Sequence, residues 1–73
     1  MSTITYNDDG SISDKDVERF SVLRHQYHRD IRRATGCGMS TIRSVLTALQ
    51  TAKTDKGQRI LKEAEKIMKD IGN

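Results

Sequence analysis

The sequence predicts an all-α fold, a compact four-helix domain built around a helix-turn-helix. After residue 13, apolar side chains recur at three- and four-residue steps, the period of an amphipathic helix. Two such patterns meet at Gly36-Cys37-Gly38, a short break of the kind that joins the helices of a helix-turn-helix. The 73 residues suffice for one small domain, and a lone cysteine excludes an internal disulfide.

Residues 1–13 are polar and poor in large apolar side chains. Asn7-Asp8-Asp9-Gly10 is typical of a turn, so a hairpin is conceivable here. An isolated two-stranded hairpin is marginally stable in water. We therefore expect a flexible acidic arm over 1–13 that only a partner would order, followed by a helical domain over 14–73.

The first helix is predicted to begin at Ser13 or Asp14, because serine caps helix N-termini and acidic side chains favour the first turn. Its inward stripe is Val17, Phe20 and Leu23, and extends to Tyr27 if the helix continues that far.

The second helix is expected over about 28–35. Glycine accepts the left-handed conformation that often ends a helix, so Gly36 should stop it, and Cys37 should tuck between the helices. The third helix is expected over about 39–51, with Ile42, Val45, Leu46 and Leu49 on its inner face.

Thr54 should cap a fourth helix over about 55–71, in which the apolar residues all fall on one face. Its solvent-facing side carries lysines interleaved with Glu63 and Glu65. This mixture of charges favours an ordinary solvated helix over a helix that binds a membrane surface. The predicted core is Phe20, Leu23, Ile31, Ile42, Val45, Leu46, Leu49, Ile60, Leu61, Ala64, Ile67 and Met68.

The charge is unevenly distributed along the chain. Residues 1–26 carry three basic and five acidic side chains, a net charge of −2, whereas residues 27–73 carry ten and five, a net charge of +5. This favours a partner that is anionic or has patches of both signs. No apolar run exceeds two residues, so we expect no membrane segment and no signal peptide, and a cytoplasmic location.

His25, His28 and Cys37 are the residues that could suggest metal or nucleophilic chemistry. A zinc site lacks a fourth ligand at suitable spacing, and a Cys–His catalytic pair lacks an orienting acid. We therefore expect no metal, no cofactor, no small-molecule ligand and no enzymatic activity.

Residues 30–46 resemble the helix-turn-helix of the lactose-repressor family, which reads roughly Asp-Val-Ala-x-x-Ala-Gly-Val-Ser-x-x-Thr-Val-Ser-x-Val-Leu. Residues 58–67 are similar to that family's next helix, and the resemblance covers about 28–68. The departures are Arg32 in place of a small alanine, His28 in place of an apolar residue, and Gly38 in place of the capping serine. The resemblance implies the fold of a DNA-binding headpiece.

The chain as a whole, including the 7–10 turn and residues 29–39, is similar to small phage-encoded regulators that bind host RNA polymerase. That resemblance implies inhibition of host transcription initiation through displacement of the sigma factor. It also implies antitermination, with both activities in the host bacterial cytoplasm.

Two hypotheses follow for the surface of the helix-turn-helix. In the first, a basic surface binds host RNA polymerase. In the second, a dimeric repressor reads duplex DNA in the major groove, with arginines and lysines on phosphates. Only Arg43 among the would-be readers suits a strong bidentate base contact, which favours the first hypothesis. The candidate binding residues are Arg29, Arg32, Arg33, Met39, Ser40, Arg43 and Ser44.

Overall fold

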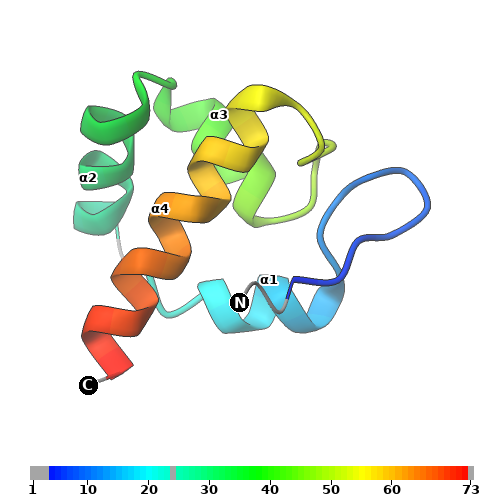
Figure 1. The fold of residues 1–73 in the computed structure, drawn as a ribbon, viewed down its shortest axis with the longest axis horizontal. Coiled ribbons are helices and arrows are strands. Elements are labelled where there is room, and N and C mark those ends of the chain that lie inside the picture. The colour runs from blue at the N-terminus through cyan, green and yellow to red at the C-terminus, as the bar shows by residue number, and fades with distance from the viewer. Residues whose placement is uncertain (1–3, 24, 73) are drawn as a thin grey trace.

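Four helices make up the computed structural model, which describes residues 4–23 and 25–72. Helices α2, α3 and α4 pack against one another in pairs, and α1 lies below α3 in the view of Figure 1. No strand is found in the described residues beyond one isolated bridge, so the all-α prediction is confirmed. The bounds are α1 Asp14–Phe20, α2 His25–Thr35, α3 Met39–Leu46 and α4 Asp55–Gly72.

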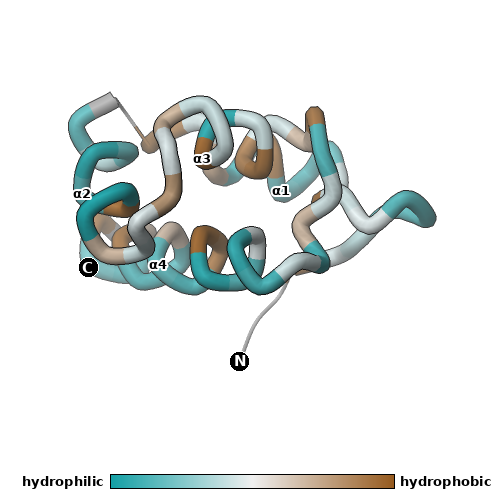
Figure 2. The backbone as a smooth tube through the Cα atoms, turned by 90° about the horizontal axis from the view of Figure 1, so that it is seen from above, coloured by the Kyte–Doolittle hydropathy of each residue, from teal (hydrophilic) through white to brown (hydrophobic). Residues whose placement is uncertain are grey.

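The core lies between α2, α3 and α4 and reaches α1 through Phe20. Figure 2 shows apolar segments of α3 and α4 facing each other across it. Nine of the twelve predicted core residues are buried, and Ile67 and Met68 are only half-buried at its edge. Ile71, placed on the apolar stripe of the fourth helix, is 47% exposed, because the last turn of α4 extends past its neighbours.

The prediction that Leu49 is buried was wrong, because α3 ends at Leu46 rather than near residue 51. Ala48 then adopts a φ of +61°, which turns the chain away from the helix axis. Leu49 donates its N–H to the carbonyl of Ser44 at 2.9 Å, while its side chain is 78% exposed. Helical spacing therefore does not place Leu49 on the inner face.

The first helix is also shorter than the sequence suggested. It begins at Asp14 with Ser13 as its cap, as predicted, but it ends at Phe20. The Ser21 hydroxyl donates to the carbonyl of Glu18, and this local bond competes with continuation of the helix. Helix α2 begins at residue 25, three residues earlier than expected, so Tyr27 belongs to α2 and not to the first helix.

The connection from α2 to α3 follows the prediction closely. Gly36 has a φ of +74°, and its N–H donates to the carbonyl of Arg32 at 2.8 Å. Cys37 is buried at 5% exposure between the helices, and its N–H donates to the Thr35 hydroxyl at 3.2 Å. The turn therefore fixes how α3 leaves α2.

The flexible arm predicted for residues 1–13 is not confirmed over residues 4–13, and residues 1–3 lie outside the described residues. Tyr6 and Ile12 form an antiparallel bridge around a turn in which Gly10 has a φ of +87°. Ile12 is fully buried in the core. The Gly10 carbonyl accepts from the N–H of Ala52 at 2.9 Å, which ties the turn to the α3–α4 connection.

Two polar groups stabilise the turn itself. The hydroxyl and the N–H of Ser11 both donate to the Asp9 carboxylate. These bonds hold the pKa of the exposed Asp9 carboxyl below its usual value.

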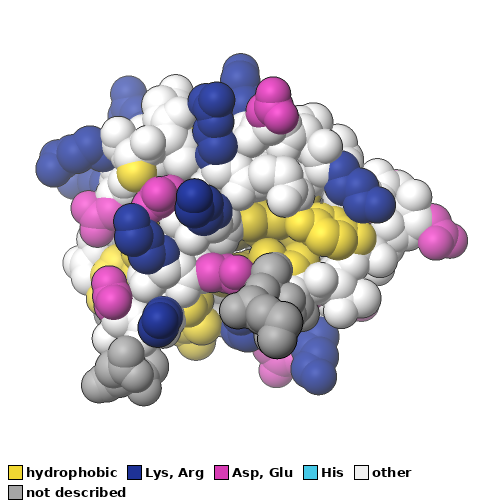
Figure 3. All heavy atoms as spheres, viewed as in Figure 1, with side chains coloured by type: hydrophobic (Ala, Val, Ile, Leu, Met, Phe, Trp, Pro, Cys, Tyr) yellow, Lys and Arg dark blue, Asp and Glu magenta, His cyan; other side chains and the backbone are white. Residues whose placement is uncertain are grey.

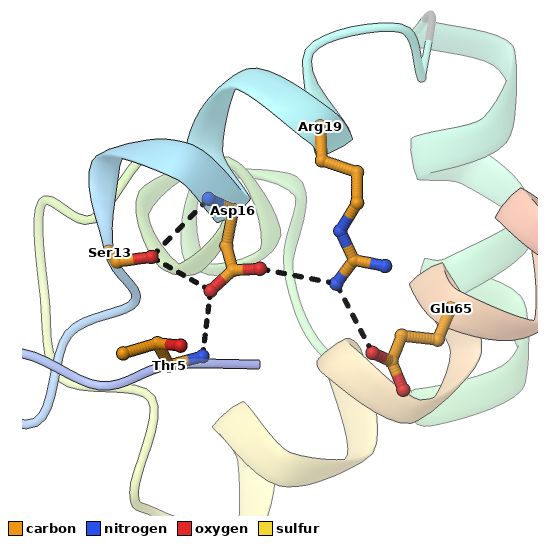
Figure 4. Close-up of polar contacts among 5 residues, drawn as sticks. All are labelled: Thr5, Ser13, Asp16, Arg19 and Glu65. Atoms are coloured by element: carbon orange, nitrogen blue, oxygen red, sulfur yellow. Dashed lines mark hydrogen bonds and ion pairs between the residues drawn. The ribbon is translucent and has the colours of Figure 1, made fainter. Parts of the chain in front are cut away.

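A carboxylate links this segment to the helices (Figure 4). Asp16, 4% exposed, accepts from the Thr5 N–H at 2.8 Å and from the Ser13 hydroxyl at 2.9 Å. Its other oxygen lies 3.3 Å from Arg19, which also contacts Glu65 of α4 at 3.2 Å. One buried acid therefore joins the N-terminal segment to α1 and, through Arg19, to α4.

Candidate interaction surface

Three arginines project from one face of α2. Arg29, Arg32 and Arg33 stand at helical spacings of three and four residues, so they share that face. All three are exposed, and together with Gly36 they line a shallow surface hollow. We call these four residues the arginine face. Gly36 leaves its floor open, since nothing lies within 4 Å of the place where a Cβ would be.

A second hollow lies where α2 meets the beginning of α3, and we call it the junction hollow. It is lined by His28 of α2 and by Met39, Ser40 and Arg43 of α3. Ser40 and Arg43 are exposed, whereas Met39 is half-buried against the core. Ser44, also predicted to bind a partner, is half-buried and does not line either hollow.

Helix α2 contributes residues to both hollows. His28 precedes Arg29 in the chain and stands one helical turn before Arg32 on the same side of the helix. Six of the seven predicted binding residues therefore line one or the other of these two hollows. His28 is added to them by the structure, since the sequence marked it as a departure from the repressor pattern and as a candidate for metal chemistry, but not as a binding residue.

The electrostatics of this surface are unbalanced. Among the described residues, the two ion pairs both use Arg19, so Arg29, Arg32, Arg33 and Arg43 face no carboxylate within salt-bridge distance. Like charges at these helical spacings repel by a few tenths of a kcal/mol, roughly, per pair. The last turn of α2 offsets part of this for Arg32 and Arg33, because cations favour a helix C-terminus. An anionic partner would relieve the remaining repulsion.

Charge is distributed differently over α4. Figure 3 shows Lys and Arg side chains interleaved with Asp and Glu over the front of this helix, with further basic side chains toward α2. The predicted alternation of Lys and Glu on the solvent-facing side of α4 is therefore confirmed. The cluster of Arg29, Arg32 and Arg33 belongs to α2, whose one acidic residue is the exposed Asp30.

Of the residues considered for metal or nucleophilic chemistry, the structure describes the side chains of His28 and Cys37, and that of His25 lies outside the described part of the chain. Within that described part, no three His, Cys, Asp or Glu side chains gather as a metal site would require. Cys37 is buried, and its thiol lies 4.0 Å from the Thr35 carbonyl. His28 lines the junction hollow instead. None of the helices within 4–23 and 25–72 has the length and apolar character needed to cross a bilayer.

Comparison with known proteins yields no relative. No family model matches the sequence, and neither a curated protein nor a solved structure matches the chain.

Proposed function

We propose that this protein is a phage transcription regulator that binds host RNA polymerase through the arginine face and the junction hollow. The observation that carries the proposal is the cluster of exposed arginines on α2 and α3 without a carboxylate partner among the described residues. Guanidinium groups recognise carboxylates in bidentate geometry, and acidic protein surfaces supply such groups.

The proposal includes a helix-turn-helix scaffold. Its support is the arrangement of α2, a three-residue turn with Gly36 in the left-handed region, and α3 packed against α2. The buried side chains of Cys37, Ile42 and Val45 occupy the positions that are apolar in the lactose-repressor pattern. Arg32 departs from that pattern, and its exposure lets it add to the surface instead of disturbing the helix packing.

A protein partner fits this surface better than base recognition does. A recognition helix reads bases with side chains near its N-terminus, and there α3 offers Met39, Ser40 and Arg43. Only Arg43 suits a bidentate contact with a base. The remaining arginines belong to α2, so with α3 in the major groove of DNA they would lie outside the groove and would not contact bases.

The further activities belong to the proposal through the resemblance to phage regulators. They are inhibition of host initiation by displacement of the sigma factor, and antitermination on phage transcription. A polymerase-bound protein of this size in the host cytoplasm would exert both without catalysis.

The alternative is a sequence-specific DNA-binding repressor. The observation in its favour is the start of α3, where Gly38 caps the helix without a side-chain hydrogen bond. The N–H groups of such a helix end suit a phosphate, and Ser40 and Arg43 lie beside it in the junction hollow.

A capture experiment separates the two functions. The tagged protein is incubated with lysates from a panel of bacteria, each treated with nuclease, and the retained proteins are identified by mass spectrometry. We expect RNA polymerase subunits to be retained. Loss of all polymerase after nuclease treatment would contradict the proposal. A repressor would instead prefer one duplex over random duplex by roughly 10³ or more, with steep salt dependence.

A further inference from the structure

The side of α2 that carries the arginine face points away from the core. Arg29, Arg32 and Arg33 are all exposed. Ile31 is fully buried, and the helical period places it on the opposite side of α2 from these arginines. Helix α2 packs against α3 and α4 through that buried side. The arginine face is therefore an outward helical surface that another protein can reach.

The donors that this face offers are side chains, because the backbone beside the hollow is already engaged. The N–H of Gly36 donates to the carbonyl of Arg32 at 2.8 Å, and that of Cys37 donates to the Thr35 hydroxyl at 3.2 Å. Phosphate sites commonly use free backbone N–H groups at a helix N-terminus. The hollow lies instead at the C-terminal end of α2, where the helix dipole disfavours an anion held by the backbone. The face therefore suits separate carboxylates, each bound by its own guanidinium.

The spacing of the arginines indicates how such carboxylates would be arranged. At 1.5 Å per residue, Arg32 and Arg33 lie about 4.5 and 6 Å from Arg29 along the helix axis. Acidic side chains three and four residues apart on a second helix repeat both separations. Side chains on one face of a strand repeat at about 6.7 Å, beyond either value. Nothing lies within 4 Å of the place where a Cβ on Gly36 would be, so a second helix could extend past the end of α2.

We propose that the arginine face binds a helix of the partner protein that carries acidic side chains one turn apart. Each carboxylate is held by a guanidinium in bidentate geometry. The inference deepens the proposed function and rests on it, since RNA polymerase is the protein that would supply the helix. Among the described residues, no carboxylate lies within salt-bridge distance of Arg29, Arg32 or Arg33. No internal ion pair printed for these arginines has to break before the partner binds.

Replacement of all three arginines by lysine tests the bidentate geometry. Arg29→Lys, Arg32→Lys and Arg33→Lys together keep the formal net charge at +3 and the helix propensity of α2 nearly unchanged. A lysine ammonium cannot form the two parallel hydrogen bonds of a guanidinium. We expect the triple variant to bind the RNA polymerase captured by the wild type at least about tenfold more weakly, measured by biolayer interferometry. Arg59→Lys, on the exposed side of α4, is the control and should weaken binding less than about twofold.

The triple lysine variant also identifies the groups that the face contacts. A carbodiimide joins a lysine amine to a carboxyl group that touches it, and mass spectrometry locates both residues. The variant is mixed with polymerase at a concentration that offsets its weaker binding. Couplings that the wild type does not give arise from positions 29, 32 and 33. We expect them to reach aspartates or glutamates three or four residues apart in one polymerase segment.

Four outcomes would overturn the inference. Equal binding by the triple lysine variant and the wild type would show that charge alone is recognised, and the proposed function would stand. New couplings to scattered acidic residues, or none, would exclude the acidic helix. Displacement of polymerase from the wild type by random duplex DNA, but not by polyglutamate of equal charge, would assign the face to phosphates. Failure of the wild type to bind any polymerase would remove the proposed function together with this inference.

Discussion

Asp16 is a buried carboxylate whose partners come from the N-terminal segment and from its own helix, α1, with the N-cap of that helix. The acid accepts hydrogen bonds from Thr5 and Ser13 and contacts Arg19. Asp16→Ala would leave these donors without their acceptor, so we expect the free energy of unfolding to fall by about 2 kcal/mol. Asp14→Ala is the control, since that exposed acid contributes about 0.5 kcal/mol through the helix dipole. Urea denaturation followed by circular dichroism measures both, and equal losses would show that the network adds nothing.

Ala48 occupies a backbone conformation that normally belongs to glycine. Its φ of +61° brings the Cβ close to the following carbonyl, at a cost of about 1 kcal/mol. Ala48→Gly should therefore raise the free energy of unfolding by up to about 1 kcal/mol, less the packing of the half-buried methyl group. Ala34→Gly, on the exposed side of helical α2, should lower it by about 1 kcal/mol. Thermal denaturation that shifted both variants downward would contradict this account.

The apolar residues of α3 and α4 show where prediction of the core from sequence succeeds, and Leu49 shows where it fails. The inner faces of α3 and α4 follow from spacing alone, and Ile42, Val45, Ile60 and Ala64 are fully buried as predicted. Leu49 fits the same spacing. What removes it from the core is the positive φ of Ala48, and nothing in an alanine signals a helix end.

The N-terminal segment is the element that the sequence described least well. Its polar composition correctly indicated a turn over 7–10, but the burial of Ile12 depends on a hydrogen bond between Gly10 and Ala52. Contacts so distant in the chain leave no periodic signal in either segment. The Asp16 network is similar, since only the Ser13-x-x-Asp16 spacing, a variant of the capping box, could have indicated it.

A conservative pair of variants tests whether this element belongs to the folded domain. Ile12→Val removes one methylene group from a fully buried side chain and should lower the free energy of unfolding by about 1 kcal/mol. Ile71→Val makes the same change on a side chain that is 47% exposed and should have an effect near zero. Urea titration at one temperature compares them. A flexible arm would give the two variants the same stability, and that result would refute the placement of Ile12 in the core.

At the scale of the molecule, the candidate surface was predictable as a set of residues but not as a shape. Spacing places Arg29, Arg32 and Arg33 on one face of a helix. The sequence could not show that Gly36 completes their hollow or that Ser44 lies outside both hollows. It also could not show that the only ion pairs among the described residues belong to Arg19. Those facts depend on how the elements pack, and they distinguish a local site from a generally basic chain.

Two triple variants with equal charge separate a local site from net charge. Arg29→Gln, Arg32→Gln and Arg33→Gln together reduce the formal net charge from +3 to zero, as do Lys62→Gln, Lys66→Gln and Lys69→Gln. All six side chains are exposed, so both variants should fold. In 0.15 M salt, charges more than about 8 Å from a contact are largely screened. The α2 variant should therefore bind polymerase at least about tenfold more weakly, and the α4 variant nearly as well as the wild type. Equal weakening would mean that the partner responds to total charge, and the arginine face would then have no special role.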